Sequence, residues 1–160
     1  MSDDCDHFER LGLPGRFALD DAELERNYLA RSREVHPDLA GDSPDMLDRS
    51  ARLNQAYATL KDPFRRADYL LKLLGGPSPT EVMQSPAEFL EEMLEMRMAI
   101  AEAEDSDKRI ELEKSLLERK ATLLDNVGEL FDKKTELRCI REQLNALKFI
   151  NGLVRDLHGD

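Results

Sequence analysis

Apolar side chains recur at alternating spacings of three and four residues along most of this chain, and they nowhere alternate strictly with polar ones. That period is typical of helices that bury one face, whereas half-buried strands show a period of two. The clearest stripe lies in the last predicted helix, over 134–157, and consists of Leu137, Ile140, Leu144, Leu147 and Val154. The sequence therefore predicts an all-α fold.

A segment rich in glycine and proline interrupts the helical pattern near the middle of the 160 residues. This segment, Gly75-Gly76-Pro77-Ser78-Pro79-Thr80, combines residues that end a helix with residues typical of a linker. We therefore expect two domains, one over 1–75 and one over 85–160, joined by a linker over 76–84.

The N-terminal half carries clear helix boundaries. Phe8 to Leu13 is compatible with a short helix. Asp20 followed by Glu23 is a capping-box pattern, which predicts a helix to about Val35. The following proline ends it, because proline disfavours helical geometry at the residue before it. Two further helices are predicted over 44–61 and 63–74, with stripes made of Leu47, Ser50, Leu53, Tyr57, Leu60, Phe64, Ala67, Leu70, Leu71 and Leu74.

The C-terminal half opens with a strong helix start. Ser85 is a candidate N-cap, Pro86 would occupy the first helical position and Glu88 the third. This helix should end near Glu104. A second is predicted over 107–131, with a stripe made of Ile110, Leu116, Leu117, Leu124, Val127 and Leu130. The helix predicted over 134–157 is the third of this half. Because the connections between the three helices are short, they predict an antiparallel three-helix bundle.

Charge and composition exclude several classes of function. The chain has 34 acidic and 23 basic residues and a net charge of -11, which disfavours binding to nucleic acid or to an anionic membrane. No run reaches the roughly 18 apolar residues of a membrane span. The acidic N-terminus does not resemble a signal or transit peptide, so a cytoplasmic location is expected.

Residues that could carry chemistry are scarce. Cys5 and Cys139 are too far apart to form a motif, so reduced thiols are expected. Cys5 and His7 could form half of a metal site, but no second pair completes it, and a disordered N-terminus is the expected alternative. No phosphate-binding loop is present, and no nucleophile is paired with a base. We expect no enzymatic activity, no metal and no cofactor.

The tripeptide His36-Pro37-Asp38 differs from these isolated residues because of its position. Alone, it would be an ordinary polar turn. Here it follows a helix with three arginines, Arg26, Arg31 and Arg33, and precedes a loop and a second helix. This arrangement resembles a J domain, the module that stimulates the ATPase of seventy-kilodalton heat-shock chaperones.

Two sequence segments make the resemblance more specific. They are Phe8-Glu9-Arg10-Leu11-Gly12-Leu13-Pro14 and Arg66-Ala67-Asp68-Tyr69-Leu70-Leu71. They are similar to the HscB-type J-domain co-chaperones of iron-sulfur cluster assembly. The resemblance covers essentially the full chain. It implies an N-terminal J domain, built as an antiparallel helical hairpin with short flanking helices, followed by a C-terminal three-helix bundle.

The resemblance also implies a partner for the J domain, an ATPase chaperone of the HscA or DnaK type. His36, Pro37 and Asp38 would contact it, and Arg26, Arg31 and Arg33 would be electrostatic contacts. Two residues depart from the pattern. Leu39 stands where many J domains have a basic residue, and Arg31 stands where an apolar residue is usual, so Arg31 could either pack or bind.

In this family the bundle binds the cluster scaffold protein, of the IscU type. The matching residues are Leu90, Glu92, Leu94, Glu95, Arg97 and Phe149. Leu90 and Leu94 are one helical turn apart and could form an apolar patch. Phe149 lies off the main stripe of its helix, which suggests an outward position. Glu91 replaces an apolar residue common in the family.

Two alternatives stay open at this stage. The chain could be a general J-domain co-chaperone with a different client, or a helical adaptor in which the tripeptide is only a turn. Exposed apolar positions on the bundle would also support a weak homodimer.

Overall fold

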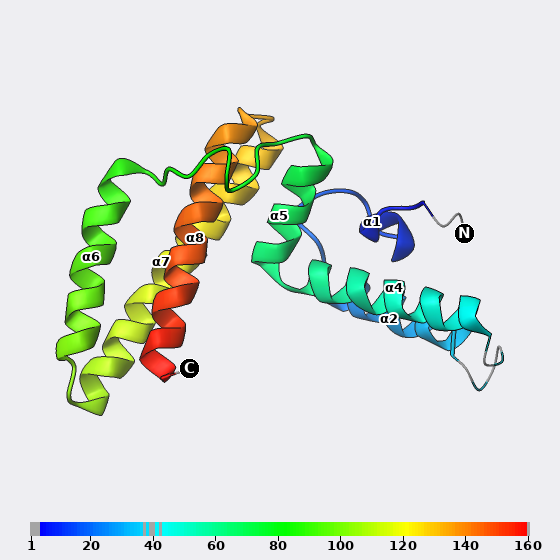
Figure 1. The fold of residues 1–160 in the computed structure, drawn as a ribbon, viewed down its shortest axis with the longest axis horizontal. Helices are drawn as coiled ribbons and strands as arrows, with labels where there is room; N and C mark the ends of the chain where they lie inside the picture. The colour runs from blue at the N-terminus through cyan, green and yellow to red at the C-terminus, as the bar shows by residue number, and fades with distance from the viewer. Residues whose placement is uncertain (1–3, 37, 39–40, 42, 160) are drawn as a thin grey trace. The chain divides into compact units, whose positions relative to one another are not determined.

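The computed structural model describes residues 4–36, 38, 41 and 43–159, and within these residues it contains helices and no strand (Figure 1). The prediction of an all-α fold is confirmed. The chain divides into two compact units, Met1–Leu70 and Leu71–Asp160. Among the helices described here, none is long and apolar enough to cross a membrane.

The first unit is built on a helical hairpin. Helix α2 (Asp21–Glu34) pairs with α4 (Pro44–Lys61), and the short α1 (His7–Arg10) packs against α4 (Figure 1). Helix α5 (Pro63–Leu73) follows directly and runs past the boundary between the units. The core of this unit contains Phe8, Leu11, Leu13, Leu24, Leu53, Ala56, Leu60, Ala67 and Leu70.

Aspartate side chains cap the first two helices, as their sequence positions suggest. The Asp20 carboxylate accepts a hydrogen bond from the Ala22 backbone N–H at 2.9 Å, so the N-cap prediction is confirmed. The full capping box occurs instead at α1. There Asp6 Oδ1 accepts from the Glu9 N–H at 2.9 Å, and Glu9 Oε2 accepts from the Asp6 N–H at 3.0 Å.

The expectation of a disordered N-terminus is wrong from Asp6 onward. The His7 ring stacks on Tyr69 with centroids 4.2 Å apart, and the His7 backbone N–H donates to the Tyr69 hydroxyl at 2.9 Å. Burial is the main cause that lowers the pKa of the His7 side chain. His7 therefore packs against α5, a role that its spacing from Cys5 in the sequence did not indicate.

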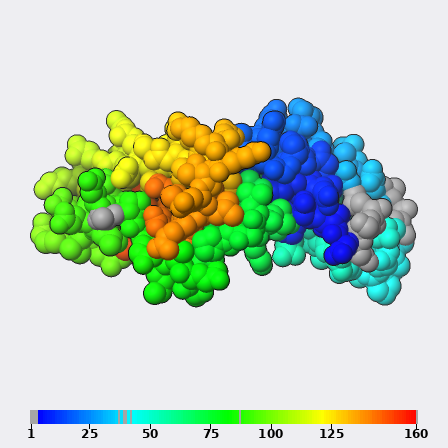
Figure 2. All heavy atoms as spheres, turned by 90° about the horizontal axis from the view of Figure 1, so that it is seen from above, coloured from blue at the N-terminus to red at the C-terminus, as the bar shows by residue number. Residues whose placement is uncertain are grey.

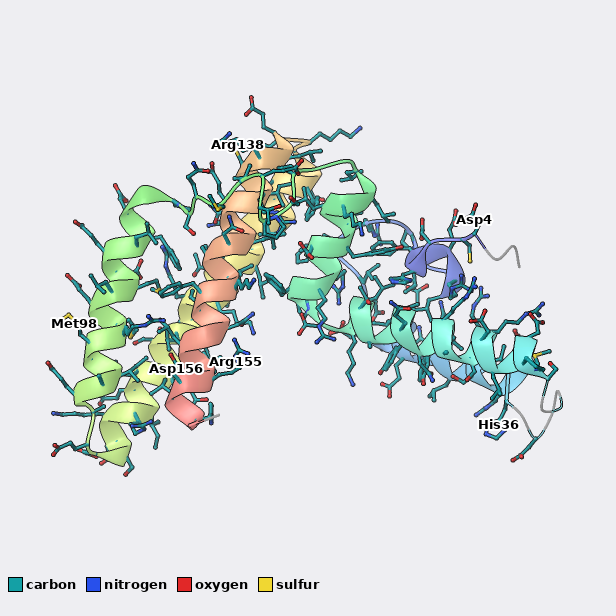
Figure 3. The ribbon with its side chains drawn as sticks, in the orientation of Figure 1. Asp4, His36, Met98, Arg138, Arg155 and Asp156 are labelled. Carbon is teal, nitrogen blue, oxygen red and sulfur yellow. The ribbon has the colours of Figure 1, made fainter. Side chains whose placement is uncertain are left out.

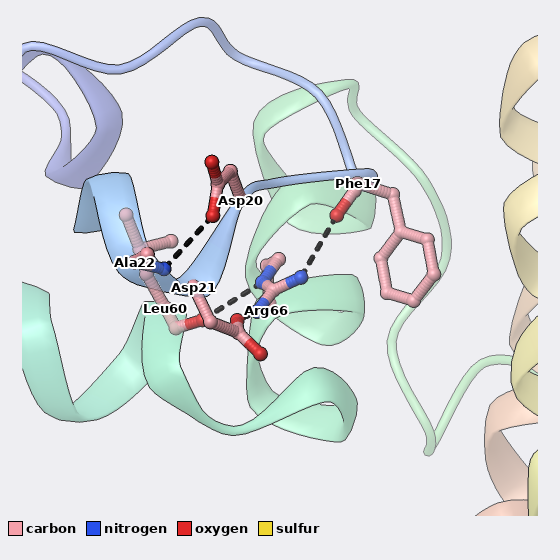
Figure 4. Close-up of polar contacts among 6 residues, drawn as sticks. All are labelled: Phe17, Asp20, Asp21, Ala22, Leu60 and Arg66. Carbon is pink, nitrogen blue, oxygen red and sulfur yellow. Dashed lines mark hydrogen bonds and ion pairs between the residues drawn. The ribbon is translucent and has the colours of Figure 1, made fainter. Parts of the chain in front are cut away.

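A buried arginine ties three segments of the first unit together (Figure 4). Arg66 Nε donates to the Leu60 carbonyl at 2.7 Å, and Nη1 donates to the Phe17 carbonyl at 3.0 Å. Nη2 lies 3.3 Å from Asp21 Oδ1. Burial lowers the pKa of Arg66 and the neighbouring carboxylate of Asp21 opposes that shift. Arg66 thus connects α5 to the end of α4 and to the start of α2.

The second unit is a bundle of three long helices, as predicted. They are α6 (Ala87–Glu102), α7 (Ser106–Asp132) and α8 (Leu137–His158), and each packs against the other two. The core of the bundle contains Phe89, Met93, Ile100, Leu116, Leu123, Val127, Ile140, Leu144, Leu147, Ile150 and Leu153.

The predicted start of α6 is wrong by one residue. Pro86 has an extended backbone, with φ -51 and ψ 135, and it is the N-cap, so Ser85 does not cap the helix. The end is also earlier than predicted, because Ala103 already has extended geometry. Helix α7, by contrast, continues through its internal Gly128 to Asp132.

Four leucine or isoleucine positions that were assigned to inward stripes are exposed. Leu47 is 54% exposed because the buried face of α4 consists of Leu53, Ala56 and Leu60 instead. Leu74 is 53% exposed because α5 has already ended at Leu73. On α7, Ile110 and Leu117 are 62% and 46% exposed, and the core positions are Leu116, Leu123 and Val127.

Residues 77–84 lie along α8 and are held there by side chains of that helix. Arg141 Nε donates to the Pro77 carbonyl at 2.8 Å. Asn145 Nδ2 donates to the carbonyls of Val82 and Gln84, each at 2.8 Å. Figure 2 shows this green segment beside the orange start of α8. The segment is therefore a packed part of the second unit.

Candidate functional sites

His36 and Asp38 lie just beyond α2, at one end of the hairpin. Val35 is the C-cap of α2, so His36 is the first residue after the helix (Figure 3). The side chains of His36 and Asp38 are 56% and 89% exposed. Pro37 and Leu39 lie outside the described residues. The two described members of the tripeptide are thus accessible to a partner.

A backbone contact orients the imidazole. His36 Nδ1 accepts a hydrogen bond from the Asp38 N–H at 3.2 Å, so the neutral ring carries its proton on Nε2. Asp38 Oδ2 lies 3.6 Å from the same Nδ1, which is too long for a hydrogen bond. The turn therefore offers a partner an N–H donor on one side chain and a carboxylate acceptor on the other.

The three arginines of α2 have different surroundings. Arg26 and Arg33 are exposed. Arg31 is half-buried, and its Nη2 lies 2.9 Å from the position that a Cβ atom on Gly12 would occupy. Gly12 has a φ of 64°, which also favours glycine. Arg31 therefore packs on the loop after α1, while the other two arginines keep their charges in solvent.

Arg33 is the arginine that shares a surface with the tripeptide. A hollow of about 420 Å³ is lined by Leu29, Ser32, Arg33, His36 and Asp38. Leu29 is 50% exposed and contributes apolar surface. The structure thus combines a guanidinium, an imidazole and a carboxylate around one apolar hollow. Arg26 does not line it.

On the bundle, Leu90 and Leu94 lie on the outward face of α6, where they are 55% and 60% exposed. Glu95 is exposed as well. Glu92 points toward α7, because its carboxylate is 3.1 Å from Arg119 Nη2. The structure therefore brings the two leucines together as expected and turns Glu92 toward the neighbouring helix.

Phe149 is only partly exposed, so the expected outward position is half correct. Its ring meets the buried Phe89 edge-on, with centroids 6.2 Å apart and an interplanar angle of 85°. The Arg97 guanidinium lies 5.1 Å from the Phe149 ring centroid, in a cation–π arrangement. Phe149 and Arg97 therefore connect α6 to α8.

Sequence reasoning did not assign a third exposed residue on α6. Met98 is 58% exposed and follows Leu94 by four residues. The spacing of Leu90, Leu94 and Met98 was available in the sequence as a signal. In the part of the chain that the structure describes, no group of three metal-ligating side chains occurs, and both cysteines are free.

Comparisons with known proteins match both units. The family described as "DnaJ domain" matches residues 6–69, and the family described as "HSCB C-terminal oligomerisation domain" matches residues 85–158. The first match includes the tripeptide, and the second includes all three helices of the bundle.

Individual relatives match over nearly the whole chain. The co-chaperone protein HscB homolog of Burkholderia multivorans is 35% identical over 162 residues, which cover 94% of this chain and 91% of the relative. The structure of chaperone HscB from Vibrio cholerae is similar with a TM-score of 0.82, at 29% identity and with 97% and 96% of the two chains covered. The human co-chaperone protein HscB gives a TM-score of 0.87 at 28% identity, with 99% and 83% covered. The chain belongs to the HscB family of co-chaperones and carries a J domain followed by the HscB C-terminal domain.

Proposed function

We propose that this chain stimulates ATP hydrolysis by a seventy-kilodalton chaperone of the HscA or DnaK type and delivers an IscU-type iron-sulfur scaffold protein to it. The observation that carries the proposal is the exposed pair His36 and Asp38 beyond the end of a helix that carries three arginines, within a chain that belongs to the HscB family. We propose a cytoplasmic location and a division into a J domain over 1–75, a linker over 76–84 that packs on α8, and a scaffold-binding bundle over 85–160.

The chaperone-binding surface consists of the turn and the neighbouring charges. His36 donates from Nε2 and Asp38 accepts, with Pro37 between them. Arg26 and Arg33 attract an acidic surface on the chaperone and raise the association rate more than the affinity. Arg31 contributes to this surface mainly indirectly. Its side chain packs on Gly12, in the loop after α1, and this contact supports α2.

The scaffold-binding surface lies on α6. Leu90 and Leu94 provide apolar contacts that a partner can bury, and Glu95 provides negative charge beside them. Glu92 lies on the α7 side of this surface, where it pairs with Arg119. Phe149 and Arg97 support the edge of this surface where α6 meets α8. Apolar anchors near the centre of an interface contribute most of its affinity, and the charges around them favour the correct partner.

Because one chain carries both surfaces, it can deliver the scaffold to the chaperone efficiently. A scaffold bound to the bundle encounters the chaperone bound to the J domain at an effective concentration set by the chain itself. The chaperone hydrolyses ATP, and this chain supplies the contacts that bring the two partners together.

The proposed stimulation of the chaperone is tested by measuring its rate of ATP hydrolysis as a function of the concentration of this chain. The wild type should accelerate hydrolysis. The double variant Arg26→Gln, Arg33→Gln should need about 3- to 10-fold more protein for half-maximal stimulation at low salt, because each exposed charge contributes roughly 0.2–1 kcal/mol. The difference should shrink as salt is added.

Arg49→Gln is the matched control, since Arg49 is an exposed arginine on α4 whose Nη2 lies 3.1 Å from Asp45 Oδ2 in the preceding turn. It should leave the half-maximal concentration unchanged. Absence of acceleration by the wild type at any concentration would contradict the proposed function.

A further inference from the structure

Apolar side chains follow one line along the outer side of α7. Ile110 and Leu117 are 62% and 46% exposed. Ala121 is exposed as well, and Leu124 is half-buried. Ile110, Leu117 and Leu124 are separated by seven residues each, and seven residues return an α-helix to within about 20° of the same direction. At 1.5 Å per residue the line extends over about 21 Å. We call these four residues the α7 row.

Carboxylates border the α7 row along one edge. Glu111, Glu118 and Asp125 each follow a large apolar residue of the row by one position, which places them about 100° further around the helix. Asp107 and Glu129 extend the same edge by four residues at each end. All five side chains are exposed. One long edge of the row therefore consists of carboxylates in successive turns of α7.

Two lysines also lie at this edge and reduce its charge only in part. Lys114 is exposed, one turn from Ile110 on one side and from Glu118 on the other. Lys133 Nζ lies 3.4 Å from Glu129 Oε2, at the C-terminal end of α7. Five carboxylates and two ammonium groups leave the edge negative, and most strongly so between Glu118 and Asp125.

The α7 row lies on the side of α7 that is turned away from α6. Arg119 pairs with Glu92 of α6, and it follows Leu117 by two positions, about 200° further around α7. The neighbouring helix α8 is met by Arg109, which donates from Nη2 to the Leu157 carbonyl at 2.8 Å. The row is therefore separate from the surface of α6 that is proposed to bind the scaffold.

We propose that the α7 row is a docking surface for an amphipathic helix of a further partner, whose apolar stripe covers the row and whose basic edge faces Glu111, Glu118 and Asp125. This surface is on a different helix from the proposed scaffold contacts and on a different unit from the tripeptide. The inference goes beyond the proposed function and does not depend on it.

A helix fits this row better than an irregular segment does. Apolar side chains that repeat every seven residues match the apolar stripe of a second helix packed alongside, and charges beside such a stripe determine which helix is accepted. Lysine or arginine beside the stripe would be attracted by the acidic edge, whereas carboxylates there would be repelled.

A second copy of this chain is a less suitable occupant for the same reason. In an antiparallel pair of α7 helices, the acidic edge of one copy would lie along the acidic edge of the other, so that Glu118 would approach the same residue of the copy. Each chain also carries a net charge of -11, which adds repulsion between copies.

The test uses the full chain and a fluorescently labelled synthetic peptide of about four heptads, with leucine at the two apolar positions and lysine at the flanking ones. Fluorescence anisotropy measures its affinity. Ile110→Ala, Leu117→Ala should bind the lysine peptide about 10- to 100-fold more weakly, because it removes two apolar contacts. Alanine is the better helix former, so loss of α7 would not explain the weaker binding. Leu73→Ala, Leu74→Ala is the matched control, with residues 46% and 53% exposed near the end of α5, and it should bind like the wild type.

The charge of the edge is tested with a second peptide that has glutamate in place of lysine. It should bind the wild type at least about 10-fold more weakly than the lysine peptide. Glu111→Gln, Glu118→Gln should weaken binding of the lysine peptide about 3- to 10-fold and reduce its salt dependence. Glu102→Gln, Glu104→Gln removes the same charge from exposed residues at the end of α6, and its effect should be smaller.

Three results would overturn the proposal. The first is no binding of the lysine peptide at millimolar concentrations, and the second is equal binding by the wild type and Ile110→Ala, Leu117→Ala. Equal affinities for the two peptides would overturn the basic edge of the partner. The third is self-association of the chain in sedimentation that Ile110→Ala, Leu117→Ala abolishes, because the row would then be an interface between two copies.

Discussion

His36→Gln is expected to remove at least nine-tenths of the stimulation of the chaperone's ATPase, at every concentration of this chain. The imidazole is held by the Asp38 N–H at Nδ1, which leaves Nε2–H as the donor to the chaperone. Glutamine places its amide on a flexible stem, so the donor loses its fixed direction. Loss of one oriented donor in a buried contact also leaves its partner group unsatisfied, which adds to the cost. The measurement is single-turnover ATP hydrolysis with variant and wild type in parallel.

The fold should not respond to this change. His36 is more than half exposed and lies after the end of α2, so its substitution should alter stability by no more than about 0.5 kcal/mol. The affinity for the scaffold should stay the same. His158→Gln is a matched control, because His158 is an exposed histidine of the bundle whose Nε2 lies 2.8 Å from Glu113 Oε1. Full stimulation by His36→Gln would refute the role of the turn.

Leu90→Ala, Leu94→Ala is expected to weaken scaffold binding by about 30- to 1,000-fold. Each truncation removes an apolar contact worth roughly 1–2 kcal/mol when a partner buries it, and 1.4 kcal/mol corresponds to a factor of ten. Stimulation of the chaperone in the absence of scaffold should be unchanged, because the J domain is intact. Calorimetric titration with the scaffold measures the first effect, and ATP hydrolysis without scaffold measures the second.

The control for general loss of apolar surface is Ile110→Ala, Leu117→Ala. These two residues are 62% and 46% exposed on α7, in the same bundle. The control should bind the scaffold like the wild type. If both double variants bind equally well, the leucines of α6 are ordinary surface residues, and the scaffold-binding surface must be elsewhere.

The sequence predicted the helices well because helix boundaries depend on local signals. The range 44–61 agrees with α4 (Pro44–Lys61), and the break at Asp62-Pro63 separates it from α5. It predicted the buried faces less well. Leu116 and Leu117 are adjacent and equally apolar, yet one is fully buried and the other is 46% exposed. A shift of one residue turns a side chain by about 100°, and only the neighbouring helices decide which of the two is buried.

For the candidate site, too, the sequence predicted local features better than contacts between distant segments. Spacing alone indicated that Leu90 and Leu94 share a face, and both are exposed. The half-buried position of Phe149 and the packing of Arg31 on Gly12 depend on residues distant in the sequence, so periodicity could not predict them. The same holds for Arg66, whose three partners come from separate segments. Such contacts become visible only in the folded chain.

The most direct test of the account is single-turnover ATP hydrolysis by the partner chaperone, with this chain and the scaffold added separately and together. If one chain binds both partners, the rate with both should exceed the sum of the two separate increases. Stimulation by this chain without any further effect of the scaffold would contradict delivery and indicate a J-domain protein with another client. No stimulation under any condition would contradict the account entirely and favour a helical adaptor.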